Sequence, residues 1–276
     1  MNATFNFSTW RLLVKQHWAE NGRRYLLFIP VIAGLILLWF VMDMLGDKDN
    51  AMSGTTQSNT YFEGLILAGG LHVYTLFNPL NSRRKAIQYY TLPASLLEKI
   101  LCTLFYGVFV FFIVYTVIFY LVDIPMVELA KRIGKPYDMM VINGQYSPSR
   151  FKKVVNFFVN EENAGYSPEQ IFIFFNIQAA VMLGTVYFRK YSLLKTIIAV
   201  TIALFACVAI ISKCTWYLPG NWNQPQFLTW QINDYMGNRL TLAPPSWMIT
   251  LVKIFGLSLA PVLWYITWLR LQEKEV

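Results

Sequence analysis

The chain has 276 residues, of which 56% are hydrophobic and only 14% are charged, and its formal net charge is +8. A soluble domain usually carries charged residues at about a quarter of its positions, so this composition excludes an ordinary soluble protein. Its long apolar runs also exclude a membrane β-barrel, whose strands are short and alternate in polarity. We therefore predict an all-α integral membrane protein that forms a single membrane domain over residues 1–276.

The first 24 residues contain an amphipathic segment, STWRLLVKQHWAENGRR. Its apolar positions recur at the i, i+3, i+4 and i+7 spacing of one helix face, while basic residues lie elsewhere. This pattern predicts a cytoplasmic helix in the membrane interface, capped by Ser8 or Thr9; an ordinary flank that anchors the first span is the alternative. The residues of this interfacial helix that we single out are Trp10, Arg11, Leu13, Val14, Lys15 and His17.

Six apolar stretches follow, each close to the roughly 20 residues that a helix needs to cross the bilayer. The second stretch is the weakest, because it contains two adjacent glycines, His72 and Pro79. We expect His72 to be a neutral imidazole hydrogen-bonded to a neighbouring helix rather than a proton relay. The predicted spans are about 25–43, 62–81, 96–122, 168–188, 193–213 and 247–269.

Two outer segments, 123–167 and 214–246, are too long to be simple turns. In the first, Ser147 followed by Pro148 predicts the start of an amphipathic helix, which presents Phe151, Val154, Val155 and Phe158 on one face. A capping box from Ser167 to Gln170 predicts where the fourth span starts. The second segment is rich in Trp and Tyr, which indicates either anchoring at the lipid headgroups or contact with a partner or an exported substrate.

The distribution of Lys and Arg predicts that both termini are cytoplasmic. With this orientation the inner segments carry about one basic residue per four positions, and the outer segments about one per eleven. The basic residues of 123–167 do not fit this rule. We expect a multi-pass protein of the plasma (cytoplasmic, inner) membrane, in contact with membrane lipid. Topology accounts for the positive charge, so no nucleic acid partner is expected.

The sequence contains none of the nucleotide-binding or hydrolytic motifs that we searched for, namely a P-loop, H-E-x-x-H and G-x-S-x-G. We expect no cofactor and no enzyme activity. Asp43, Glu63, Lys195 and Lys253 all lie at the ends of the predicted spans, which argues against an ion-coupled transporter. Any transport would then draw its energy from another subunit. For a membrane-embedded enzyme, the candidate polar groups are His72, Asn176 and Gln178.

The connection between the second and third spans carries the strongest local signal, QYYTLPASLLEK at residues 88–99. Ser95 and Glu98 form a capping box directly before an apolar run, so the third span starts at about Leu96. Pro93 ends whatever structure precedes it and leaves room for a short surface helix between Asn81 and Thr91. The helix would carry the basic cluster Arg83, Arg84 and Lys85, with Tyr89, Tyr90 and Leu92 able to face a cytoplasmic partner.

This stretch resembles the type-2 ATP-binding-cassette (ABC) exporter permeases. In that family the comparable stretch has Leu-Thr-Leu-Pro, a small residue, Ser and a following Lys. The matching residues here are Thr91, Leu92, Pro93, Ala94, Ser95 and Lys99. An N-terminal interfacial helix, six spans and cytoplasmic termini extend the resemblance over nearly the whole chain. The 123–167 segment is longer than the family pattern.

The resemblance implies a permease subunit that works with a separate ABC ATPase subunit and a second permease copy, as a homo- or heterodimer. It implies export of a lipid, drug or peptide-like substrate, with residues 83–99 as the coupling helix that docks on the ATPase. A non-transporting membrane scaffold or a sensor-associated protein is the main alternative, and a membrane-embedded enzyme is the weaker one. The ATPase-coupling residues are Arg83, Arg84, Lys85, Tyr89, Tyr90, Leu92, Pro93, Ser95, Glu98 and Lys99.

Overall fold

The computed structural model describes residues 5–46, 52–133, 140–142, 145–147, 154–156, 170–188, 190–216, 230–233, 239–242 and 246–275. Most of these residues are helical. The helical elements are α1 (Phe7–Gly46), α2 (Gly54–Phe77), η1 (Asn78–Asn81), α3 (Arg83–Tyr90), α4 (Leu96–Leu104), η2 (Phe105–Val110), α5 (Phe111–Ile133), α6 (Gln170–Tyr187), α7 (Ser192–Trp216) and α8 (Ser246–Glu275). Two short hairpins are also present, from β1 (Met140–Ile142) with β2 (Gln145–Ser147), and from β3 (Trp230–Asn233) with β4 (Arg239–Leu242).

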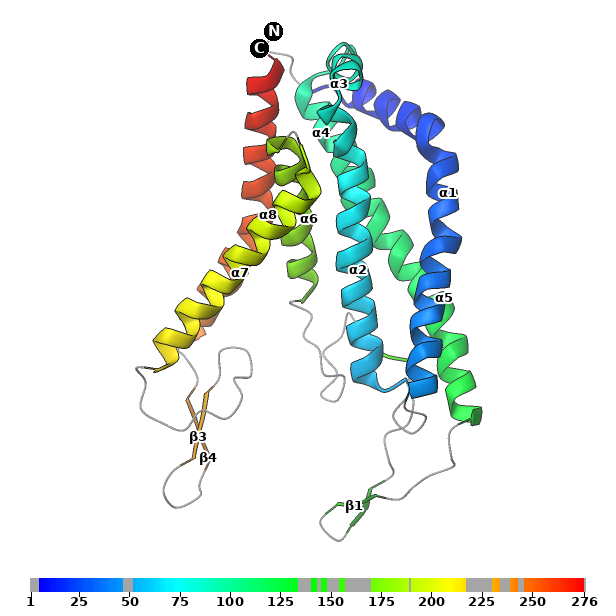
Figure 1. The fold of residues 1–276 in the computed structure, drawn as a ribbon, viewed down its shortest axis with the longest axis vertical. Helices are drawn as coiled ribbons and strands as arrows, with labels where there is room; N and C mark the ends of the chain where they lie inside the picture. Colours follow the sequence, from blue (N-terminus) through cyan, green and yellow to red (C-terminus); the bar gives the residue numbers. More distant parts are fainter. Residues whose placement is uncertain are drawn as a thin grey trace.

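The long helices run side by side and both termini lie at the same end of the molecule, next to α3 (Figure 1). Helix α6 packs against α2, α7 and α8, while α1 packs against α2, α4 and α5. Four helical segments are long and apolar enough to cross a membrane: Phe7–Gly46, Leu96–Arg132, Gln170–Tyr187 and Lys253–Glu273. Helices also occupy the predicted second and fifth spans, as α2 and α7, but these two are not among the four.

The predicted interfacial helix and first span form one continuous helix, α1, with no break in the helix at residue 24. Its first turns lie across the end of the bundle and the remainder runs along it (Figure 1). The predicted cap was also wrong. The Asn6 carbonyl accepts from the backbone N of Trp10 at 3.0 Å, and Asn6 Oδ1 accepts from the backbone N of Ser8 at 3.0 Å. Asn6 is therefore the N-cap, one turn before the periodic apolar pattern begins.

The third predicted span is longer than expected. It starts at Leu96 as predicted, continues through the π-helical turn η2, and ends at Ile133 rather than near residue 122. Pro125 does not end it, although Pro in a helix interior removes a backbone hydrogen bond. The charged residues Asp123, Lys131 and Arg132 therefore belong to a helix and not to a loop. At the other end of the bundle, η1 follows α2, and Pro79 lies within it.

Close helix contact in the middle of the bundle depends on small residues. A Cβ atom at Gly69 would overlap the Nε2 of Gln178, and one at Gly184 would overlap the side chain of Thr196. Glycine lets α2 approach α6, and α6 approach α7, more closely than any other residue would. This is the usual basis of helix association in lipid, where apolar surface gains little from leaving the solvent.

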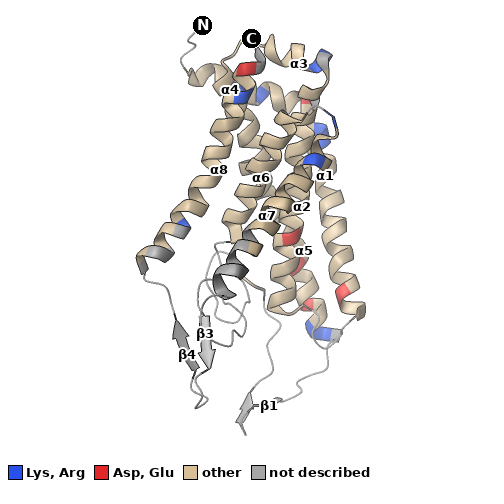
Figure 2. Cartoon of the chain, turned by 60° about the vertical axis from the view of Figure 1, so that its left-hand side comes forward, with Lys and Arg blue, Asp and Glu red and all other residues tan. Residues whose placement is uncertain are grey.

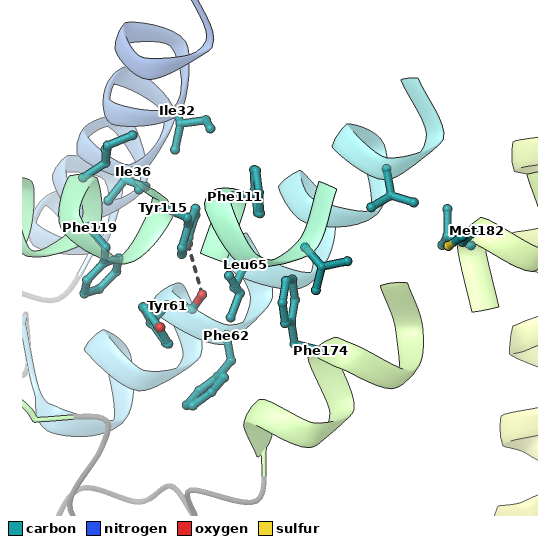
Figure 3. Packing of buried hydrophobic residues seen from close by; sticks show 14 of the residues in the cluster. Ile32, Ile36, Tyr61, Phe62, Leu65, Phe111, Tyr115, Phe119, Phe174 and Met182 are labelled. Carbon is teal, nitrogen blue, oxygen red and sulfur yellow. Dashed lines mark hydrogen bonds between the residues drawn. The ribbon is translucent and has the colours of Figure 1, made fainter. Parts of the chain in front are cut away.

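Aromatic side chains fill the space between α2 and α5 (Figure 3). Tyr61 and Phe119 are fully buried, with ring centroids 5.1 Å apart. The Tyr115 hydroxyl donates to the backbone O of Tyr61 at 3.0 Å, and the hydroxyls of Tyr61 and Thr116 are 2.9 Å apart. These two hydrogen bonds join α2 to α5 within an otherwise apolar contact.

The amphipathic helix predicted after Ser147 is not confirmed. Ser147 ends strand β2, and Val154–Asn156, in the middle of the predicted helix, are not helical. Val155 is instead buried: its backbone N donates to Gln57 Oε1 at 3.0 Å, and its O accepts from the Tyr120 hydroxyl at 3.1 Å. Residues 148–153 and 157–169, including Pro148, Ser167 and Pro168, lie outside the described residues. Helix α6 starts at Gln170, two residues after the predicted start.

Candidate functional site

Residues 82–95 fold as the sequence pattern predicts. Helix α3 covers Arg83–Tyr90, and Ser82 is its N-cap residue. The backbone N of Thr91 still bonds to the Ile87 carbonyl, after which the chain turns, with Ala94 N donating to Leu92 O at 2.8 Å. Ser95 then caps α4. The surface helix, the break at Pro93 and the start of the third span are therefore confirmed as structure.

Glu98 joins the starts of two helices that are far apart in the sequence. Its Oε2 accepts from the backbone N of Ser95 at 2.9 Å, and Ser95 Oγ accepts from the backbone N of Glu98 at 3.2 Å, which completes the predicted capping box. Its Oε1 accepts from the backbone N of Asn6, the N-cap of α1, at 2.7 Å. The carboxylate is only 2% exposed. One carboxylate thus accepts hydrogen bonds at the N-terminal ends of two helices, where the helix dipole is positive.

Lys99 fastens α3 to α4. Its Nζ donates to the backbone O of Tyr90, the last residue of α3, at 3.1 Å, and lies 5.6 Å from the centroid of the Tyr89 ring. A cation at the C-terminal end of a helix is stabilised by the helix dipole and by the aromatic face beside it. Lys99 is 3% exposed. The side chain therefore closes the hairpin between α3 and α4 and does not reach a partner.

The N-terminal part of α1 rests on the π-helical turn η2. The Trp10 and Phe105 rings meet edge to face with centroids 5.7 Å apart, and the Tyr106 hydroxyl donates to the backbone O of Val14 at 3.0 Å. The His17 ring lies 4.7 Å from the Tyr106 ring. The predicted apolar face, Trp10 with Leu13, Val14 and His17, is partly buried, while Arg11 and Lys15 are exposed. Its place in the membrane interface stays a prediction.

The exposed part of the predicted coupling segment is smaller than the sequence suggested. Arg84, Lys85 and Pro93 are exposed, as are Ile87 and Gln88, which the sequence pattern did not indicate. Ile87 is 56% exposed and lies one turn after Arg84. A helical projection of residues 83–90 would have found this apolar side chain among the charges. Tyr89, Tyr90, Leu92 and Ser95 are partly buried.

The exposed surface does not include every residue of the predicted coupling segment. Glu98 and Lys99 do not form part of a docking surface, because both side chains are buried and hydrogen-bonded within the protein. Nothing is described for the side chain of Arg83, although its backbone belongs to α3. The available surface is the pair Arg84 and Lys85 with Ile87 and Gln88, which we call the α3 face.

Basic side chains gather at the end of the molecule that carries α3, the start of α4 and both termini (Figure 2). A smaller basic group, Lys131 and Arg132, lies at the far end of α5. Lys131 is paired there with Glu128, whose Oε2 is 3.3 Å from its Nζ.

The buried polar side chains within the bundle do not converge. Asn176 Nδ2 donates to the backbone O of Gly256 on α8 at 3.0 Å, Gln178 packs against Gly69 on α2, and His72 stacks on Phe111 with ring centroids 4.9 Å apart. Asp123 on α5 is fully buried, and neither carboxylate oxygen has a hydrogen-bond partner among the described residues. No group of three metal-ligating side chains occurs in the described part of the chain.

Comparison with known proteins found no match: no family model fits the sequence, and no curated protein and no solved structure resembles it significantly.

Proposed function

We propose that this protein is the membrane-spanning permease subunit of an ATP-driven exporter of the type-2 ABC class, and that the α3 face receives a separate ATPase subunit. The single observation that carries the proposal is the construction of the α3–α4 hairpin. A short helix with an exposed basic and apolar face is fastened by Lys99 to a helix that continues for 38 residues, from Leu96 to Ile133.

This construction meets the physical requirement for coupling. A force applied to α3 can reach the bundle only if the connection between α3 and α4 is stiff. The connection contains Pro93, the Leu92–Ala94 turn and a capping box, and Lys99 closes it by a hydrogen bond to the end of α3. Glu98 extends the same connection to the N-terminus of α1. Movement of α3 would therefore shift α1 and α4 together.

The lack of a recognisable nucleotide-binding motif in the sequence supports a division of labour between two subunits. Arg84 and Lys85 provide charge for the encounter with the ATPase, and Ile87 provides an apolar anchor. Two permease copies and two ATPases would form the working transporter. The predominantly apolar helices favour a lipid, an amphipathic drug or a hydrophobic peptide as the substrate.

A direct test is to purify the tagged protein from membranes of the organism that makes it and to measure vanadate-sensitive ATP hydrolysis. We expect a P-loop ATPase without membrane spans to co-purify. The double variant R84E/K85E should lose both the ATPase and the hydrolysis. The matched control K131E/R132E reverses two basic residues at the other end of the bundle and should retain them. If both variants behave like the wild type, the α3 face is not the docking site. If no such ATPase is recovered with the wild type, the exporter assignment itself is wrong.

A scaffold or sensor-associated protein remains the alternative, and the same preparation distinguishes it. Such a protein would co-purify with partners that are not ATPases and would bind them through the outer segments. No observation on the described residues favours a membrane-embedded enzyme, because His72, Asn176 and Gln178 face different neighbours.

A further inference from the structure

A cavity of about 90 Å³ lies between α1, α2 and the η2–α5 segment, away from the α3 face. Aromatic rings make up much of its wall, including Tyr25 of α1, His72 of α2, and Tyr106 of η2. Aliphatic side chains such as Ile32 and Val110 complete it. An apolar cavity of this kind does not hold ordered water but accepts apolar molecules. The chemistry of the wall therefore selects a hydrocarbon group.

The cavity opens on the side of the bundle. Two of its rim residues, Leu26 of α1 and Val114 of α5, are exposed on the outer surface of the helices. Both belong to segments that are long and apolar enough to cross the membrane. The mouth therefore faces the hydrocarbon of the bilayer, and the nearest source of a hydrocarbon group is a lipid acyl chain.

Two basic residues of α1 lie next in sequence to the cavity-lining Tyr25. Arg23 and Arg24 are exposed and directly precede Tyr25 on α1. The Arg24 guanidinium lies 5.9 Å from the ring centroid of Phe28, which also lines the cavity. The nearest acidic residue on this helix, Glu20, accepts a hydrogen bond from Gln16 at 2.9 Å. Clusters of arginine and lysine beside a membrane helix attract anionic headgroups.

A polar pair lies beside the apolar wall. His17 Nε2 and the Tyr25 hydroxyl are 2.5 Å apart, and the Tyr25 ring faces His72 with centroids 5.5 Å apart. The π-helical turn η2 places Tyr106 beside the same pair. Such turns are frequent at functional sites because they shift side chains out of the regular helical register. The cavity is thus lined by apolar groups, with a polar pair and the Arg24 guanidinium beside it.

We propose that this cavity binds an anionic phospholipid of the surrounding bilayer, with one acyl chain inserted between α1 and α5 and the headgroup held by Arg23 and Arg24. The exposed arginines suit an anionic headgroup, and the apolar lining suits an acyl chain. This site is independent of the proposed function, because it involves neither the α3 face nor ATP.

Trp18 lines the cavity and provides the measurement. The full chain is reconstituted in phosphatidylcholine vesicles that contain phosphatidylglycerol or phosphatidylcholine brominated along the acyl chains, and tryptophan fluorescence is recorded. The contribution of Trp18 is the difference from the variant W18F. We expect brominated phosphatidylglycerol to quench this contribution at lower mole fraction than brominated phosphatidylcholine. Equal quenching by the two lipids would overturn the proposal.

Two pairs of variants locate the site. R23Q/R24Q should reduce the preference for phosphatidylglycerol roughly five-fold per arginine, whereas R11Q/K15Q, which removes two exposed charges from the same helix, should leave it unchanged. V114F should fill the cavity and abolish the selective quenching, whereas I113F, at the exposed neighbouring position, should not. Native mass spectrometry of each folded variant counts the phosphatidylglycerol retained. Retention equal to the wild type in V114F would place the lipid elsewhere and refute the site.

Discussion

At the end of the bundle that carries α3, a few polar groups join the helices through hydrogen bonds, whereas in the middle the helices meet through glycines and aromatic rings. Glu98 links the start of α4 to the start of α1 by hydrogen bonds. In the middle, the approach of α2 to α6 depends on Gly69 and on many weak contacts around it. At the α3 end the stabilisation comes from a few hydrogen-bonding atoms, whereas in the middle it is distributed over many weak contacts. Substitutions at the two places should therefore differ in how much they lower the stability and in which helices they affect.

The largest expected effect comes from Glu98. E98A leaves the backbone N–H groups of Asn6 and Ser95 without their acceptor and should cost roughly 2 to 4 kcal/mol of stability. E98Q keeps one acceptor oxygen and should lose about half as much. Thermal unfolding in detergent measures both, and hydrogen exchange should increase at the starts of both α1 and α4. If exchange increases only in α4, the link between the two helices has no energetic importance.

Gly69 offers the corresponding test in the middle of the bundle. G69A places a methyl group against Gln178, Phe174 and Phe111 and should destabilise the protein by roughly 1 to 3 kcal/mol. In the double variant G69A/Q178A, space is restored and part of the loss should be recovered. The control is G34A on α1, where a Cβ atom meets nothing within 4 Å, so helix propensity should leave stability equal or slightly higher. Equal melting temperatures for G69A and G34A would contradict the close packing.

A smaller change is expected for Tyr115. Y115F removes the hydrogen bond to the Tyr61 carbonyl but keeps the aromatic ring. Interhelical hydrogen bonds in membranes contribute on average about 0.6 kcal/mol, so the melting temperature should fall only slightly. Y265F, at an exposed position of α8, is the matched control and should have no effect. A loss as large as that of E98A would mean that directional bonds also govern the middle of the bundle.

The smallest effect on folding is expected on the α3 face. R84E/K85E changes two exposed side chains with no described partner and should alter stability by less than about 0.5 kcal/mol. Its melting temperature should match that of the wild type even where ATP hydrolysis is lost. A strongly lowered melting temperature would show that the arginine and lysine support the hairpin, and the docking test would then need single-residue variants.

Local signals predicted the hairpin, because Pro93, Ser95 and Glu98 lie within six consecutive positions. They could not predict the second role of Glu98, since its partner Asn6 is 92 positions away and contributes a backbone N–H that every residue except proline possesses. The burial of Lys99 was missed for a related reason: a lysine near a span end usually reaches water, and only the fold places the end of α3 above it.

The ends of the helices were the other source of error. Asp123 suggested a loop, because a charge in hydrocarbon is costly, yet α5 continues through it to Ile133. The π-helical turn η2 leaves no mark in FYGVFV that distinguishes it from an α-helix. The lining of the cavity beside Tyr25 comes from three separate parts of the chain, so neither spacing nor composition indicated it.

The bond between Asn6 and Glu98 also sets an order of events during synthesis. The first residues of α1 leave the ribosome well before their acceptor, which follows 92 positions later. At about 5–20 residues per second, roughly 5 to 20 s separate the two. During that interval the start of α1 has neither Glu98 nor the Phe105 and Tyr106 rings to rest on. The start of α1 therefore cannot form its native contacts until the third hydrophobic segment has been made.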